Sequence, residues 1–308
     1  MNFYKILAEI EKLDPEVYER LDPRRRMFKH FAGFGKKMSA AALPLALGTM
    51  FNKAYGQSPT LSQDIQNVLM FAHNSEYIGM FLYDNALKQS TLVPSADTAA
   101  ITLMRNDEMG HIKFLKQTAA QFGVTNLPTL TADMFDYTGG KGAAGGPFAD
   151  VNTNYATFLG VAQGIEDNDV RAYKGGAPTL MPNNTLLEGA LNIHSVEARH
   201  ASHVRSLRRG GPTAVADTSN LMMKPKSWIS GTDGGGPKPP VTTPIYVGED
   251  NVMQGSVDVS KVSSTTAVPA AAAMAAASEA FDEPLALAAA KANARTFVKP
   301  PYDTQYFA

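Results

Sequence analysis

The sequence predicts an all-α protein: a four-helix bundle with an N-terminal leader or helix and a long irregular C-terminal tail. Between residues 61 and 207 apolar side chains recur at helical intervals, with almost none of the alternation typical of strands. Clusters of Gly and Pro divide this stretch and mark helix ends. We expect a leader over residues 1–57, a bundle over 58–210, and an extension over 211–308 that packs on the bundle or on a partner.

The leader joins a basic segment to a short apolar run. Residues 1–22 have the spacing of a short amphipathic helix, and a mostly apolar run follows from Met38 to Phe51. This run holds about 14 residues, which is too few to span a bilayer but suits the apolar region of an export signal. Between them, Arg24-Arg25-Arg26-Met27-Phe28-Lys29 resembles the twin-arginine export motif, with Pro23 where Ser or Thr is usual.

The twin-arginine resemblance implies export of the folded protein to the periplasm, with a mature chain that begins near Gln57 or Ser58. The alternative is a cytoplasmic protein in which the same residues form a surface helix, a basic loop and a buried helix. The chain contains no cysteine, which leaves the compartment open because such a composition suits cytosol and periplasm alike.

Four helices are expected between Ser58 and Gly211. Ser58-Pro59 precedes the first helix, and Gly123 ends the second. Two glycine pairs make the next stretch a loop, and Gly210-Gly211 ends the fourth helix. The expected helices cover residues 60–89, 95–122, 149–174 and 184–209.

Each expected helix carries a glutamate in the middle of its apolar stripe, although an unpaired buried carboxylate costs several kcal/mol. The spacing repeats, because Glu76 lies 32 residues before Glu108 and Glu166 lies 31 residues before Glu197. Glu108 and Glu197 are each followed three residues later by a histidine, which projects both side chains from one helix face. The expected metal ligands are Glu76, Glu108, His111, Glu166, Glu197 and His200.

Two cations would offset the negative charge of four carboxylates in one core. Carboxylate oxygens together with neutral imidazoles suit iron or manganese, so the sequence predicts two metal ions, iron first, with manganese or zinc as the other options. The two ions are expected about 3.5–4 Å apart. A plain bundle with Glu and His at its ends is the alternative.

This pattern is that of the di-metal carboxylate site in the ferritin-like superfamily, which the chain resembles over residues 60–210. Segments such as Ile193-His194-Ser195-Val196-Glu197 are similar to a bacterial ferritin-like group related to plant desiccation proteins. The resemblance implies that Asp107, beside a ligand Glu, holds a ligand histidine through its free N–H, and that Arg199 also supports the site. An ordinary surface charge is the alternative for both.

Further polar residues near the ligands are weaker candidates. Asp169 is a possible additional ligand, as a second acid on the third helix is in rubrerythrins; a surface pair is the alternative. His194 and His203 are expected to point away from the metal, because each three-residue step turns about 60° around the helix. His73 is expected as a polar cap or a core histidine. Tyr77 and Tyr83 are expected to pack in the core, with a redox-active tyrosine beside the metal as the alternative.

The extension changes character along its length. Residues 231–240 are rich in Gly and Pro, and residues 268–294 are dominated by alanine, which favours helix. Pro284 is expected to break or start a helix there. Trp228, the single tryptophan, needs a surface to pack against, so we expect part of the extension to lie on the bundle, with a dimer arm as the alternative.

Composition limits the partners. The net charge of −1, from 28 Lys+Arg and 29 Asp+Glu, argues against a general nucleic-acid binder. Without cysteine there are no thiolate metal sites, iron–sulfur clusters or disulfides. We expect no stable membrane insertion, and a homodimer stays open. Because the chain lacks a Cys-x-x-Cys electron-transfer module, a redox enzyme of this kind needs an external reductant.

Three functions are compatible with such a site, and the sequence does not decide whether the protein is an enzyme. The first is an oxidoreductase that acts on O₂, peroxide or Fe²⁺. The second is metal storage or sequestration without turnover. The third is a structural or stress-protective protein, of the desiccation-related kind, in which metal stabilises the bundle.

Overall fold

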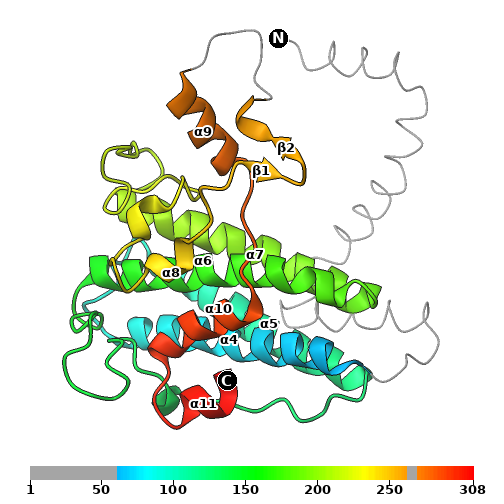
Figure 1. Cartoon of the computed structure of the whole chain (residues 1–308). Coiled ribbons are helices and arrows are strands. Elements are labelled where there is room, and N and C mark those ends of the chain that lie inside the picture. The colour runs from blue at the N-terminus through cyan, green and yellow to red at the C-terminus, as the bar shows by residue number, and fades with distance from the viewer. Residues whose placement is uncertain (1–60, 262–268) are drawn as a thin grey trace, which may run out of the picture. The chain divides into compact units, whose positions relative to one another are not determined.

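Four long helices form the bundle in the computed structural model, which describes residues 61–261 and 269–308 (Figure 1). The prediction of an all-α bundle is confirmed. The expected leader, including the twin-arginine segment, lies outside the described residues. The bundle helices are α4 (Gln63–Lys88), α5 (Thr98–Gln121), α6 (Tyr155–Leu180) and α7 (Asn184–Arg209).

Three of these helices begin and end within three residues of the prediction, but α6 does not. It begins six residues after the expected start, because the side chain of Asn154 accepts hydrogen bonds from the amides of Ala156 and Thr157 and so caps the helix there. It also continues six residues past the expected end. The helix passes through Gly175 and Gly176, which permit close packing in its last turns.

The helices pack as two hairpins. Short connections join α4 to α5 and α6 to α7, and each pair packs along its length, so both pairs run antiparallel. The chain crosses from one hairpin to the other over residues 122–154, which include the 3₁₀ helix η2 (Ala132–Met134). One long crossover between two helical hairpins is the connectivity of ferritin-like bundles.

Apolar side chains fill the bundle in two separate clusters. Along α4, Leu69 and Ala72 belong to one cluster, and Ile78 and Leu82 belong to the other. Glu76 lies between them, in the middle of the helix. The packing therefore leaves a polar layer inside an otherwise apolar core.

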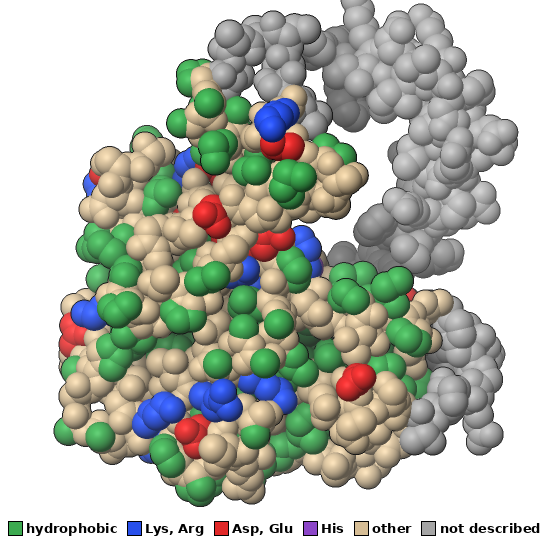
Figure 2. All heavy atoms as spheres, in the orientation of Figure 1, with side chains coloured by type: hydrophobic (Ala, Val, Ile, Leu, Met, Phe, Trp, Pro, Cys, Tyr) green, Lys and Arg blue, Asp and Glu red, His purple; other side chains and the backbone are tan. Residues whose placement is uncertain are grey.

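The extension after α7 lies over the bundle as a chain of short elements (Figure 1). Its helix α10 packs on α4 and α6, and α11 packs on α4. Hydrophobic side chains are spread over its upper part in Figure 2, where Met253, Val257 and Met274 are exposed. Its elements are η3 (Asp233–Gly235), α8 (Thr243–Tyr246), the antiparallel strands β1 (Met253–Gln254) and β2 (Val257–Asp258), η4 (Val259–Lys261), α9 (Ala270–Glu279), α10 (Leu287–Ala294), η5 (Arg295–Phe297) and α11 (Tyr302–Phe307).

A buried ion-pair network fixes the extension to the bundle. Arg205 of α7 donates to Asp167 of α6 at 2.6 Å and to Asp233 of the extension at 2.5 Å. The hydroxyl of Tyr246 donates to the same Asp167 at 2.6 Å. All four residues are at most 2% exposed, so every charge in the network depends on its partners. Trp228, by contrast, is half exposed, and its indole N–H donates to Glu279.

The backbone before α10 approaches α6 so closely that Gly175 of this helix has no room for a side chain. A Cβ atom on Gly175 would lie 1.8 Å from the carbonyl oxygen of Leu285, and the Leu285 amide donates to the Arg171 carbonyl at 3.0 Å. The chain before α10 therefore touches the backbone of α6 at this point.

We predict that Gly175→Ala lowers the free energy of unfolding by about 1–3 kcal/mol, because the new methyl group overlaps a backbone oxygen that must move. Gly110→Ala in α5 is the matched control, since a Cβ atom there meets nothing within 4 Å. It is expected to raise stability by about 0.5–1 kcal/mol through helix propensity. Denaturant unfolding measures both, and equal effects would contradict the packing described for Gly175.

Candidate metal centre

Each bundle helix presents one glutamate to the polar layer, and α5 and α7 each add a histidine one turn later. The four glutamates are 1–2% exposed. The histidine of α7 is also buried, whereas the side chain of the α5 histidine is 12% exposed. The apolar stripes that bury the helices thus carry these side chains into the core.

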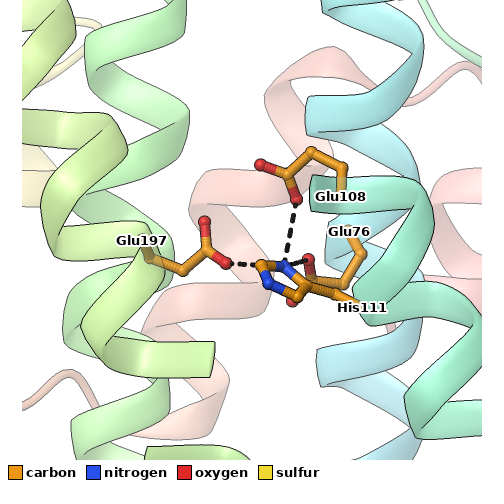
Figure 3. Close-up of side chains that lie close together, drawn as sticks. All are labelled: Glu76, Glu108, His111 and Glu197. Carbon is orange, nitrogen blue, oxygen red and sulfur yellow. Dashed lines mark hydrogen bonds and ion pairs between the residues drawn. The ribbon is translucent and has the colours of Figure 1, made fainter. Parts of the chain in front are cut away.

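The first group of side chains joins one hairpin to the other (Figure 3). His111 of α5 lies between carboxylates that reach it from three helices. Its Nδ1 atom is 3.0 Å from Glu76, 3.8 Å from Glu108 and 2.9 Å from Glu197. One ligand atom from each of these four residues lies within 4.8 Å of the others, which is close enough to hold one metal ion.

The second group repeats the first with the other histidine. Nδ1 of His200 is 3.1 Å from Glu108, 3.5 Å from Glu166 and 3.3 Å from Glu197. These four residues also offer ligand atoms within 4.8 Å of one another. Glu108 and Glu197 belong to both groups, so the two groups form one continuous cluster.

The cluster has more acceptors than its hydrogen atoms can satisfy. Within the described residues, Glu166 Oε2 and both carboxylate oxygens of Glu197 are buried without a hydrogen bond. His111 approaches Glu197 closely, but the angles do not form a hydrogen bond. Unpaired buried oxygens that face imidazole nitrogens are a donor set that fits metal ions.

The electrostatics of the cluster show the same excess of negative charge. Burial and the three neighbouring carboxylates raise the pKa of Glu108 well above its usual value. Burial also raises the pKa of Glu166, to about 7, against the opposing effect of His200. Burial alone would raise the pKa of Glu197, but His111 and His200 hold it below its usual range. Positive charge inside the cluster therefore decides which carboxylates ionise.

The histidines respond in the opposite direction. Burial alone would lower the pKa of both rings. Glu76 and Glu197 overcome this effect at His111, and Glu166 does so at His200, so both pKa values are raised. In the metal-free cluster the imidazoles thus take the place of cations.

Two tyrosines hold the outer carboxylates, which are the two glutamates that belong to one ligand group each. Their hydrogen bonds cross between the hairpins. Tyr83 of α4 donates to Glu166 of α6, and Tyr173 of α6 donates to Glu76 of α4. Each tyrosine lies seven residues after the glutamate on its own helix and bonds the glutamate of the other helix. Tyr83 is buried as expected, and its hydroxyl in addition bonds a glutamate of the cluster, which the sequence did not predict.

The three residues expected to support or extend the ligand set lie at different distances from the cluster. The Asp107 carboxylate lies 3.3 Å from Nε2 of His200, where it can accept that N–H and turn Nδ1 toward the cluster. Arg199 is exposed on the outer face of α7. Asp169 is buried, and burial and the carboxylates of the cluster raise its pKa, but it joins neither ligand group. Its role as a ligand stays a prediction.

Three further histidines of the described residues belong to neither ligand group. Nδ1 of His194 lies 2.9 Å from the carbonyl oxygen of Val170, and His203 is exposed. His73 is buried with Nδ1 near Asn74, as a core histidine.

A small apolar cavity has Tyr173 in its wall, the residue whose hydroxyl donates to Glu76 of the cluster. Its volume is about 30 Å³, and its walls include Phe71, Leu115, Tyr173 and Ala190. A space of this size and lining suits a small uncharged molecule rather than an ordered water network.

Residues 64–209 match the family model of the ferritin-like domain. No curated protein and no solved structure matches the chain significantly. The matched residues span the four bundle helices and the whole Glu/His cluster, so the match supports assignment of the bundle to the ferritin-like superfamily. The narrower likeness to the desiccation-related group stays a prediction. Along the described residues, no helix has both the length and the apolarity of a membrane span.

We predict that Tyr173→Phe lowers the free energy of unfolding of the metal-free protein by about 1.5–3 kcal/mol, the range for a lost hydrogen bond to a charged group. Tyr83→Phe is expected to behave alike, because it removes the matching bond on the other hairpin. Tyr302→Phe is the control, since its hydroxyl has no hydrogen bond within the described residues. Urea unfolding distinguishes them; a loss no larger than in Tyr302→Phe would contradict the crossed arrangement.

Proposed function

We propose that the chain holds two metal ions, iron or manganese with iron, and acts as an oxidoreductase on O₂, peroxide or Fe²⁺. The observation that carries the proposal is the pair of ligand groups that share Glu108 and Glu197. In this assignment Glu76 and His111 serve one ion, Glu166 and His200 serve the other, and the shared carboxylates serve both.

Charge supports two ions rather than one. Four carboxylates enclosed in a core repel one another, and two divalent cations would offset their four negative charges. Oxygen ligands with one imidazole for each ion suit iron and manganese better than softer metals. A bound pair of such ions supplies a two-electron change that one ion alone does not.

The chain's own residues orient and enclose the site. Tyr83 and Tyr173 fix the outer carboxylates, and Asp107 fixes the ring orientation of His200. Burial of the glutamates keeps bulk water away from the cluster. The apolar cavity lined by Tyr173 favours a substrate as small and uncharged as O₂. Electrons must come from an external reductant or from Fe²⁺ itself, because the chain has no cysteine.

A non-catalytic role is the second candidate, and the enclosure of the cluster favours it. The extension packs on the bundle, and the four glutamates are buried, so a large substrate or a mineral has no access to them in this arrangement. In that role the metal would stabilise the bundle in a structural or stress-protective protein.

We predict that protein purified without chelators carries about two metal ions per chain, and that Glu108→Ala/Glu197→Ala abolishes metal binding, because both ions lose their shared ligands. The bundle should stay helical by circular dichroism, since the substitution removes charge together with metal. Glu188→Ala, an exposed residue of α7, is the matched control and should keep the metal. Metal analysis of the three proteins is the measurement; metal retained by the double variant would refute the assignment.

Oxygen uptake separates the two candidate functions on the same samples. An oxidoreductase should consume O₂ after addition of Fe²⁺, and the double variant should not. Bound zinc, with no O₂ or peroxide consumption and a lower melting temperature after chelation, would instead favour the stabilising role.

We also propose periplasmic localisation through the twin-arginine route, with a cytoplasmic protein as the alternative. Residues 24–29 motivate this proposal, and transport of a folded chain would carry the metal already bound. Substitution of both Arg24 and Arg25 by Lys is expected to retain the folded protein in the cytoplasm, as measured by cell fractionation. Periplasmic protein in that variant, or an intact Met1 in native protein, would contradict export.

A further inference from the structure

The outer face of α7 carries a groove that the metal centre does not use. It is a shallow groove, wide open to solvent, lined by residues of α7 and of the loop that follows it. One stripe of the helix forms its floor, and the loop after α7 forms its wall. The polar side chains that line it are Arg199, Ser202, His203, Ser206, Arg209 and Ser227, and no acidic residue lines it.

The positive charges of this groove have no counter-charge within the described residues. Arg199 and His203 are exposed, and neither forms an ion pair or a hydrogen bond there. The guanidinium of Arg209 donates only to neutral acceptors, the carbonyls of Ala214 and Pro225 and the hydroxyl of Ser227, at 2.7, 2.8 and 3.0 Å. The charge of Arg209 is therefore held at the edge of the groove and is not cancelled.

The same contacts of Arg209 hold the walls of the groove in a fixed position. They fix the loop against the last turn of α7, so that Ser227 faces the helix across the groove. At the end of the helix, the amides of Gly210 and Gly211 donate to the carbonyls of Leu207 and Ser206 at 3.0 and 2.9 Å, so these two carbonyls are satisfied within the chain.

We propose that this groove binds an oxyanion of the phosphate class, either inorganic phosphate or a short polyphosphate. Arginine matches phosphoryl oxygens with paired N–H donors, and serine hydroxyls donate to the same atoms. The groove has no Phe, Tyr or Trp side chain on which a base could stack. Arg199 and Arg209 are ten residues apart, about 15 Å along the helix, so the groove has room for more than one phosphoryl group.

This site is independent of the metal centre. Arg199 neighbours His200 in the sequence, but it points outward while His200 points into the core. Loss of the metal should leave the anion site intact, and failure of either proposal would not affect the other.

Isothermal titration calorimetry on the full-length protein tests the proposal. The two ligands titrated are inorganic phosphate and tripolyphosphate. We expect one saturable site per chain. Arg199→Gln/His203→Gln should weaken binding at least about tenfold, because the guanidinium and an imidazole N–H donor are lost together. Lys113→Gln is the control, an exposed cation of α5 outside the groove, and should bind as the parent does. Tighter binding of tripolyphosphate would identify an extended ligand, and equal binding would identify free phosphate; either supports the proposal.

Three results would overturn it. Absence of saturable binding is the first, and equal weakening in Lys113→Gln, which indicates diffuse charge, is the second. The third is a duplex DNA that binds more tightly than tripolyphosphate with the same dependence on Arg199, since the groove would then serve a nucleic-acid backbone. Glu108→Ala/Glu197→Ala should bind phosphate as the parent does, and loss of binding there would assign the anion to the metal centre.

Ser202→Leu fills the groove without removing charge, so this variant should lose phosphate binding.

Discussion

The mutual repulsion of four carboxylates in one helical core shapes the structure around them. A buried carboxylate without a partner costs several kcal/mol, and here each carboxylate lies beside others of the same sign. Two histidines, two tyrosine hydroxyls and close helix packing reduce that cost, but they leave Glu166 and Glu197 with oxygens that accept no hydrogen bond within the described residues. Metal ions, which the two Glu/His groups could hold, would complete this balance.

The repeat in the chain explains how the cluster arises. Each hairpin alone supplies two carboxylates and one imidazole, which is too few ligands for two ions and too much charge to bury. When the hairpins pack, Glu108 and Glu197 come within reach of both histidines. The crossed bonds of Tyr83 and Tyr173 then tie α4 to α6 at the same level. Hairpin association and assembly of the site are therefore the same event.

The sequence predicted the parts of this arrangement that depend on local spacing. The bounds of α7 are close to the expected ones, since Asn183 caps its start and Gly210 its end, and the Glu and His residues of the cluster share one layer because helical periodicity places them on inner faces. The start of α6 was wrong because Asn154 caps the helix six residues after the expected start, and its end was wrong because the helix continues through Gly175, which packs against the backbone of Leu285. The partners of Arg205 could not be predicted, since Asp233 is distant in sequence. The repeated seven-residue step from Glu76 to Tyr83 and from Glu166 to Tyr173 was a usable signal for the crossed bonds.

X-ray diffraction from crystals of the iron-loaded protein, with anomalous scattering at the iron edge, tests the central claim most directly. The account predicts two iron peaks per chain, about 3.5–4 Å apart, with Glu108 and Glu197 in contact with both. A single peak, or iron bound only outside the Glu/His cluster, would contradict it.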